Sequence, residues 1–289
     1  MHIRFTNLDK VLFPRTGFTK GDLIEYYLRV APVLLPHLEG RPITIRRFPD
    51  GVDGPSFFEK HPSQGTPSWV RRVTLSSGTY VLVEDVETLA LLANLAAIEL
   101  HVPQWRVDDS GVPKPPDLLV FDLDPGAPAG ITECAKVATL VAATLRSAYE
   151  LDALPKTSGS KGLQLYARWN GPGDTRAVAR AVAEHLAQRR PQLVVANMTK
   201  SLRRGRVLID WSQNHVAKTT VAPYSLRANP EPTVSTPLQW TEVERAASGE
   251  GSGLTFLADQ VLDRIDELGD LFAPLLASDT VRRRRRRSR

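Results

Sequence analysis

The stretch Phe121-Asp-Leu-Asp-Pro125 decides the fold of this chain, because it ends the apolar run Leu118 to Phe121 with two carboxylates. Such a run predicts a buried strand, in which residues two apart share a face and lie roughly 7 Å from each other. Asp122 and Asp124 would then share one face, while the apolar residues around them would face the core. Paired carboxylates at a strand end suit Mg²⁺ or Mn²⁺, but Asp-x-Asp before Pro-Gly is also typical of solvated turns.

A third acidic residue, Asp210, lies in the run Val207 to Ser212, whose composition also predicts a strand. Because an unpaired buried carboxylate is costly, Asp210 lies in solvent at a strand end, pairs with a base such as Arg206, or binds metal. The residues alone leave these alternatives open. Three carboxylates could hold two ions, which stabilise the attacking and leaving oxygens of a phosphoryl transfer.

Composition predicts a globular protein, since the chain has 289 residues, of which 42% are hydrophobic and 24% charged. The single cysteine, Cys134, excludes an internal disulfide and a cysteine-based zinc cluster. No apolar stretch reaches the roughly 18 residues of a membrane span, and the N-terminus lacks the apolar core of a signal peptide. We therefore expect a cytoplasmic protein without membrane contact, associated with the nucleoid if it binds DNA.

The basic charge of the chain is concentrated at its C-terminus. The formal net charge is +5, but residues 282–289 contain seven arginines and no acid, which leaves −2 on the remainder. We therefore expect one folded domain over residues 1–275 and a disordered arginine-rich tail over residues 276–289. Such a tail binds polyanions in a salt-dependent way, although it could also serve only solubility.

Helix and strand patterns fill the rest of the chain. The sequence Thr19-Lys-Gly-Asp22 is a capping box, which predicts a helix that ends near Pro32 or Pro36. A helix after the strand of Asp122, followed by a returning strand, predicts a βαβ-like unit. Strands are predicted over 43–48, 72–75, 80–83 and 162–169, and helices over 87–100, 132–149, 174–190 and 257–268.

The turn Thr157-Ser-Gly-Ser-Lys-Gly162 lies between the paired acids and Asp210 in the sequence, directly before a predicted strand. Its small residues expose backbone N–H groups and Lys161 adds a positive charge, a combination that can bind phosphate. It is not a Walker A loop, and most turns rich in serine and glycine bind nothing. The turn is therefore a weak phosphate-site signal by itself.

Several stretches match one family in the same order along the chain. They are Thr6-Asn-Leu-Asp-Lys-Val-Leu-Phe-Pro14, Phe57-Phe-Glu-Lys60, Gly65-Thr-Pro-Ser-Trp69, Asp122-Leu-Asp-Pro125, Thr157-Ser-Gly-Ser-Lys-Gly-Leu163, Asp210-Trp-Ser-Gln213 and Thr219 to Arg227. From about Thr6 to Trp240 the chain thus resembles the polymerase domain of bacterial ligase D, in the archaeo-eukaryotic primase superfamily. The resemblance implies an α/β (α+β) fold with a two-lobed catalytic core and an RRM-like element.

The resemblance also implies roles for residues of the nucleotide site. It assigns two Mn²⁺ or Mg²⁺ ions to the triad Asp122, Asp124 and Asp210. It assigns the triphosphate to Ser158, Lys161, His101 and Arg227, with Gln213 supporting the same pocket. It assigns base stacking to Phe57 and Phe58, and contacts with the incoming nucleotide or template to Arg46 and Arg47.

A second implied site would bind the 5′-phosphate on the far side of a DNA gap through Asn7, Lys10 and Lys20. For the lysines, the alternative is a pair of solvated charges. Without the resemblance, His101 would be expected to be satisfied locally, adjacent phenylalanines to lie in the core, and the two arginines to lie on an exposed strand.

One position departs from the family pattern. Gln164 stands where the family usually has histidine, and a glutamine forms hydrogen bonds but cannot become a cation. We therefore expect weakened activity, with a DNA-end-binding scaffold as the extreme case. The chain also lacks the Lys-x-Asp-Gly ligase motif, which suggests a stand-alone polymerase domain.

The expected function is that of a template-directed nucleotidyltransferase that fills short gaps or extends ends during DNA repair, most simply non-homologous end joining. The resemblance implies use of NTP and dNTP with a preference for ribonucleotides. The implied partners are DNA ends, gapped duplex with a 5′-phosphate, a Ku homologue and a separate ligase. A metal-dependent nuclease is the alternative, because an acidic triad serves hydrolysis equally well.

Overall fold

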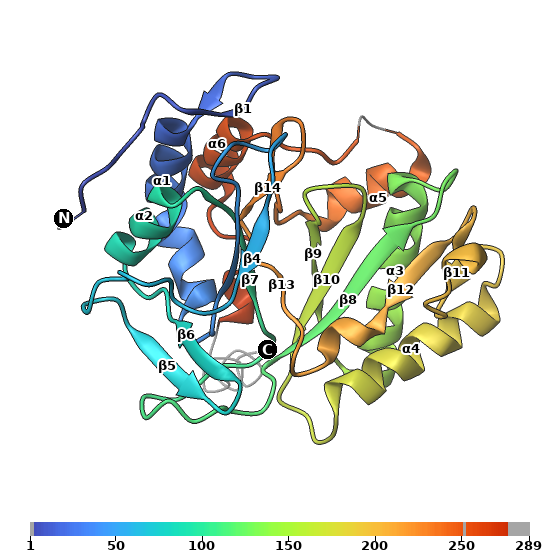
Figure 1. The fold of residues 1–289 in the computed structure, drawn as a ribbon. Helices are drawn as coiled ribbons and strands as arrows, with labels where there is room; N and C mark the ends of the chain where they lie inside the picture. Colours follow the sequence, from blue (N-terminus) through green and yellow to red (C-terminus); the bar gives the residue numbers. More distant parts are fainter. Residues whose placement is uncertain (1–2, 251–252, 277–289) are drawn as a thin grey trace.

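Two large hydrophobic cores divide the residues that this computed structural model describes, 3–250 and 253–276, into two lobes (Figure 1). The first core combines segments from both ends of the chain, Leu12 to Val102 and Ala222 to Leu262. The second core contains residues from Leu119 to Ala246. The chain therefore leaves the first lobe, builds most of the second, and returns. The predicted C-terminal tail lies almost entirely outside the described residues.

The helix α1 (Lys20–Leu38) begins at the predicted capping box, in which the Thr19 hydroxyl accepts from the Asp22 amide and the Asp22 carboxylate accepts from the Thr19 amide. Of the two predicted ends the second is confirmed, because the helix continues through Pro32 and ends at Leu38, just beyond Pro36. Each proline removes one backbone hydrogen bond. Burial of the last turns in the first core compensates for this loss.

The sheet of the first lobe has the order β13-β7-β3-β4, built from Thr220–Val221, Ala97–Val102, Thr44–Arg47 and Phe57–Glu59. The helix predicted over 87–100 was wrong in its second half, since α2 (Val86–Asn94) ends and β7 follows. β7 lies between two strands and is mostly buried, so it lacks the alternation that marks a half-exposed strand. Only its pairing partners distinguish it from a buried helix.

The remaining elements of the first lobe include strands close to the predicted ranges. The predicted strands at 43–48, 72–75 and 80–83 correspond to β3, β5 and β6. Outside the four-stranded sheet the lobe contains β1 (Val11–Phe13), β2 (Phe18–Thr19), β5 (Arg72–Leu75), β6 (Gly78–Val81), β14 (Leu226–Ala228), β15 (Pro232–Val234) and α6 (Ala258–Leu268). α6 packs against α1, as Figure 1 shows.

The sheet of the second lobe has the order β11-β12-β8-β10-β9. Its strands are Val194–Val195, Val207–Asp210, Leu118–Pro125, Leu163–Arg168 and Ala153–Thr157, in that order. Three helices contribute to the core on one face of it, α3 (Ile131–Tyr149), α4 (Thr175–Arg189) and α5 (Trp240–Ser248). Neither β9 nor α5 was predicted. The predicted helices at 132–149 and 174–190 are confirmed.

The β8-α3-β9-β10 connection corrects the simple βαβ-like prediction. β10 lies between β8 and β9 and is antiparallel to both, so the strand that follows α3 is not the neighbour of β8. The result is the split β-α-β arrangement of a β-α-β-β-α-β unit, which fits the expected RRM-like element. None of the helices among residues 3–250 and 253–276 is long and apolar enough to cross a membrane.

The strand register of the second lobe places four polar side chains in one row across four strands. Lys156 on β9 pairs with Gln164 on β10, Gln164 pairs with Asp122 on β8, and Asp122 pairs with Asp210 on β12. Their apolar neighbours along the strands, such as Leu123, are buried on the opposite, helix-covered face. The face of the sheet opposite these helices therefore carries the polar row.

We expect Gly162→Ala to lower the free energy of unfolding by roughly 2 kcal/mol, since overpacking of this kind shifts the backbone. A Cβ at Gly162 would lie 2.1 Å from the Leu123 carbonyl oxygen, so β8 and β10 would have to separate. Gly253→Ala is the matched control, because its Cβ would meet only Thr255 Oγ1, at 4.0 Å. Urea unfolding measures both, and equal stability of the two variants would contradict this prediction.

Candidate active site

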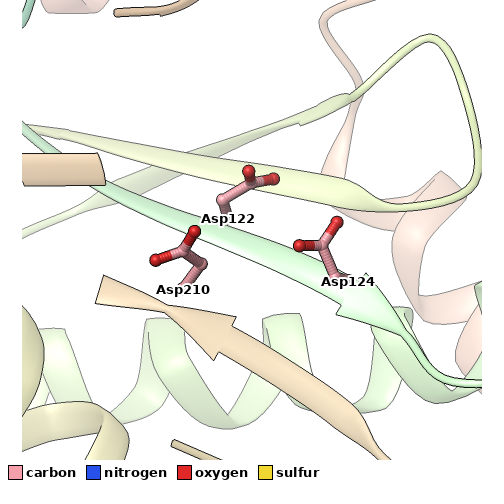
Figure 2. A group of neighbouring side chains, drawn as sticks. All are labelled: Asp122, Asp124 and Asp210. Atoms are coloured by element: carbon pink, nitrogen blue, oxygen red, sulfur yellow. The ribbon is translucent and has the colours of Figure 1, made fainter. Parts of the chain in front are cut away.

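The three predicted metal-binding carboxylates lie together on the face of the second sheet opposite α3, α4 and α5. Asp122 and Asp124 project from β8 and Asp210 from the end of β12, each with one oxygen within 4.8 Å of the others (Figure 2). The Asp210 carboxylate accepts hydrogen bonds from the Ser212 amide at 2.9 Å and the Gln213 side chain at 2.8 Å. The Arg206 guanidinium donates to the Pro191 carbonyl, so the alternative Arg206–Asp210 ion pair is not formed.

Burial, together with repulsion inside the cluster, raises the pKa of two of its carboxylates. Burial and the Asp124 charge raise the pKa of Asp122 to about 7, although its hydrogen bond from Gln164 lowers it. Burial and the Asp210 charge raise the pKa of Asp124 as well. Three carboxylates held together against this repulsion form an all-oxygen donor set, which is the chemistry that Mg²⁺ and Mn²⁺ prefer. The residues present therefore fit divalent cations.

Gln164 is integrated into the acidic cluster. Its side-chain nitrogen donates to Asp122 Oδ1 at 3.0 Å, and its oxygen accepts from the Lys156 ammonium at 2.6 Å. Lys156 is fully buried and was missed by sequence reasoning. The sequence showed only a lysine directly before the Ser/Gly turn, because β9 was not predicted as a strand. Gln213, which the resemblance places in support of the triphosphate pocket, donates to the Asp210 carboxylate.

A buried acid in the first lobe, Glu99, connects three of the predicted nucleotide ligands. It lies 2.9 Å from His101 Nε2, 3.5 Å from Arg227 and 3.6 Å from Arg46, and it accepts from the Ala228 amide. Burial alone would raise the pKa of Glu99, but the hydrogen bond from His101 and the Arg227 charge lower it to about 2. The ionised acid therefore holds these donors together, a role that the sequence did not reveal because β7 was predicted as helix.

His101 is satisfied locally through Glu99, in agreement with the alternative to the family role. Because the Glu99 carboxylate only accepts, Nε2 of the imidazole carries the proton. Burial lowers the pKa of His101, and the nearby Arg227 and Lys156 charges lower it further against the effect of Glu99. The Nδ1 atom remains the atom that could face a ligand.

Two adjacent phenylalanines on β4 form an exposed aromatic surface. The residue surfaces of Phe57 and Phe58 are 46% and 58% exposed, so the alternative that they lie in the core was wrong. The guanidinium of Arg46 lies 5.4 Å from the Phe58 ring and that of Arg47 lies 5.3 Å from the Phe57 ring. These contacts hold the rings in place while leaving aromatic surface free to stack on a base. The Phe58 ring also contacts His101, with centroids 5.6 Å apart.

The Ser/Gly turn lies against Arg227 at the junction of the lobes. The Ser158 hydroxyl accepts from the Ser160 and Gly162 amides at 3.2 Å, while Lys161 is exposed. Gly159 has φ +71°, and a Cβ there would lie 2.5 Å from the Arg227 side chain. The turn and Arg227 are thus brought together by a close approach that only glycine permits.

The predicted 5′-phosphate residues gather in the first lobe, near the start of α1. The Lys10 carbonyl accepts from the Lys20 amide at 2.8 Å, and the Asn7 carbonyl accepts from the Lys10 amide at 3.1 Å. Lys10 forms an ion pair with Asp50 at 2.9 Å. Lys20 is 95% buried and donates to Thr6, and burial together with Lys10 lowers its pKa, so it is not a solvated charge.

The fold and the carboxylate cluster together are typical of the archaeo-eukaryotic primase class. The family model described as the primase-polymerase domain of LigD matches residues 19–272, and the chain belongs to this family. Domains of this family are metal-dependent nucleotidyltransferases, which confirms the enzyme class predicted from the sequence. The nuclease alternative is not supported.

Relatives are found among end-joining proteins and solved polymerase domains. The multifunctional non-homologous end joining protein LigD of Mycolicibacterium smegmatis is 49% identical, over 96% of this chain and 37% of that protein. The bifunctional non-homologous end joining protein LigD of Bacillus subtilis is 33% identical, over 92% of this chain and 43% of that protein. The polymerase domain of Mycobacterium tuberculosis ligase D in complex with DNA superposes with a TM-score of 0.90 at 44% identity, covering 96% of this chain and 99% of that one. The chain spans less than half of the curated relatives' length.

We expect Asp122→Asn to stabilise the metal-free chain at pH 8. Because folding raises the pKa of Asp122 to about 7, the folded chain binds more protons than the unfolded chain and loses stability as pH rises from about 4 to 7. The asparagine removes this loss, so we expect a gain of roughly 4 kcal/mol at pH 8 and little change at pH 4. Urea unfolding in EDTA at both pH values measures the difference.

The matched control is Asp263→Asn, which replaces an exposed carboxylate on α6. We expect its stability to stay within about 0.5 kcal/mol of the wild type at both pH values. A metal-free Asp122→Asn variant that is less stable than the wild type at pH 8 would contradict the repulsion described above.

Proposed function

We propose that this chain is a template-directed nucleotidyltransferase that fills short gaps and extends ends during non-homologous end joining. The observation that supports this most directly is the carboxylate cluster of Asp122, Asp124 and Asp210 beside a phosphate-type turn that lies against Arg227. The first feature suits metal-assisted phosphoryl transfer, and the second suits a nucleoside triphosphate. The relatives named above, which are end-joining proteins, support the pathway.

The carboxylate cluster would hold two Mn²⁺ or Mg²⁺ ions. When bound, such ions supply the positive charge that lowers the pKa of a primer 3′-hydroxyl and neutralises a leaving pyrophosphate. Gln164 and Gln213 hold two of the carboxylates in place through their side-chain nitrogens. The protein's own contribution is therefore to hold the carboxylates of Asp122 and Asp210 in one orientation.

The nucleotide would lie between the cluster and the first lobe. Ser158, Lys161 and Arg227 would bind the triphosphate, because each offers donors that suit phosphate oxygens. His101 would donate through Nδ1, the ring atom that Glu99 does not occupy, only as an imidazolium, a form that the negative charge of a bound triphosphate favours. The rings of Phe57 and Phe58 would stack on a base, with Arg46 beside them. We propose that both NTP and dNTP are substrates, with the ribonucleotide preferred.

We expect the chain to extend a primer across a short gap when it is supplied with Mn²⁺ and NTP or dNTP. Asp122→Ala should reduce the rate by roughly 10³-fold or more, since metal-assisted charge stabilisation contributes several kcal/mol. Asp263→Asn, on an exposed face of α6, should extend normally. The measurement is gel-resolved extension on a gapped duplex with each nucleotide type.

Binding without extension by the wild type would support the scaffold alternative, and Gln164→His would then be the variant to test. Loss of primer without added nucleotide would indicate hydrolysis and contradict the polymerase proposal. Faster extension with dNTP than with NTP would contradict only the ribonucleotide preference.

We also propose that Asn7, Lys10 and Lys20 bind the 5′-phosphate on the far side of a gap. Burial and, to a smaller extent, the Lys10 charge lower the pKa of Lys20, and a phosphate between the two ammonium groups would offset their repulsion. The binding would depend on the phosphate and not on base sequence. A Ku homologue and a DNA ligase would act on the same ends.

We expect Lys20→Met to remove the preference for a 5′-phosphorylated gap over the same gap with a 5′-hydroxyl. One charge-assisted contact corresponds to about tenfold in affinity, so the phosphorylated substrate should bind about tenfold more weakly and the hydroxyl substrate unchanged. Lys136→Met, on an exposed position of α3, is the matched control. Fluorescence anisotropy with both substrates measures the ratio, and a ratio unchanged by Lys20→Met would place the phosphate elsewhere.

A further inference from the structure

The polar row across the second sheet contains a cation that the proposed reaction does not use. Lys156 is fully buried on β9, next to Gln164 on β10, which is 4% exposed and pairs with Asp122 on β8. Cross-strand neighbours of this kind lie close enough for their side chains to touch. A buried lysine without a function is rare, since its ammonium loses hydration.

We propose that Lys156 is a positioning residue for the metal-binding carboxylate of Asp122, and that it acts through the side-chain amide of Gln164. This inference rests on the metal role proposed above for Asp122. It concerns the metal site alone and requires neither DNA nor nucleotide.

Donors around the Gln164 oxygen determine which way its amide points, and Lys156 is the nearer of them, since the Tyr166 hydroxyl donates to the same oxygen at a longer 3.4 Å. An ammonium group only donates, and Lys156 Nζ lies 2.6 Å from Gln164 Oε1. Turning the amide over would place its NH₂ group against the ammonium, donor against donor. The nitrogen of Gln164 is therefore directed to Asp122 Oδ1, where it donates at 3.0 Å.

The surroundings of Lys156 hold the ammonium in place. Its second acceptor is the Ser235 hydroxyl, which donates in turn to the Thr157 carbonyl at 2.9 Å. The Tyr166 ring lies beside it, 5.3 Å from Nζ to the centroid, a distance that suits a cation–π contact. Ser235 belongs to the segment that returns to the first lobe, so the ammonium lies where the two lobes meet.

The polar row also places the Lys156 ammonium and the Asp122 carboxylate on either side of the neutral Gln164 amide. The hydrogen-bond partners of the ammonium, Gln164 and Ser235, are both uncharged. Burial lowers the pKa of Lys156, whereas the Asp122 charge raises it. The hydrogen bond from Gln164 uses one acceptor site of the Asp122 carboxylate and fixes its plane, which leaves the remaining oxygen sites available for a cation.

Direct binding of Mn²⁺, measured by the electron paramagnetic resonance signal of the free ion, tests this proposal without nucleotide or DNA. Residues that do not touch the metal but form hydrogen bonds with its ligands typically contribute 10–100-fold in metal affinity. We expect Lys156→Met and Gln164→Leu each to weaken Mn²⁺ binding by about tenfold. The double variant should bind no more weakly than the weaker single variant, because both substitutions remove the same contact to Asp122.

Matched controls separate positioning from stability. Gln104→Met replaces a buried glutamine of similar exposure, whose side chain donates to Thr220 at 2.9 Å. It should lower the melting temperature but leave Mn²⁺ affinity unchanged. Lys156→Gln keeps a donor and Gln164→His keeps one donor and one acceptor, so both should retain Mn²⁺ affinity within about threefold, which is less than the roughly 10–100-fold expected when such a contact is lost.

Wild-type Mn²⁺ affinity in Lys156→Met or in Gln164→Leu would overturn the proposal. If Lys156→Met does not fold, the comparison of Gln164→Leu with Gln164→His decides, and equal affinities in these two would overturn it. Mn²⁺ binding that is absent in the wild type, or unaffected by Asp122→Ala, would overturn the metal site itself and this inference with it. Mn²⁺ binding that needs Asp122 but neither Lys156 nor Gln164 would leave the metal site standing and refute only this inference.

Discussion

The antiparallel pairing of β8 with β10 and with β12 is the constraint on which the site depends. Its register places Asp122 between Gln164 and Asp210, on the face of the sheet opposite α3, α4 and α5. Side chains alternate between faces along a strand, so a slip of one residue would turn the carboxylates into the apolar core. The register is protected because Leu123 and its apolar neighbours would be exposed by the same slip.

Two groups of acids in this chain illustrate opposite electrostatic situations. Glu99 is buried among cationic and hydrogen-bond donors, which lower its pKa, and it organises the residues around it in the charged state. Asp122 and Asp124 face each other and Asp210, so burial and repulsion raise the pKa of both. Groups of the protein itself balance the charge of Glu99, whereas the cluster of Asp122, Asp124 and Asp210 gains stability from an added cation. This difference distinguishes a structural acid from one suited to metal.

The candidate nucleotide site requires segments from distant parts of the chain. Glu99 and His101 lie on β7, and Arg227 lies on β14, which joins the first lobe after the chain has built most of the second. The Gly159 carbonyl accepts hydrogen bonds from the Asn229 and Thr233 side chains, both at 2.6 Å, so the phosphate-type turn is held against the returning segment. The junction thereby brings donors from one lobe next to the carboxylates of the other.

The sequence by itself determined those features that depend on local pattern. The capping box of α1, the period of α3 and α4, and the Asp-x-Asp placement at the end of an apolar strand could all be read directly, and ordered motifs supplied the family. Only the tertiary structure decided which strands are neighbours. β7 and β9 were missed because a central strand lacks alternation and a short strand with an internal proline resembles a loop. The roles of Glu99 and Lys156 followed from that pairing, since a buried charge has meaning only through partners that are distant in sequence.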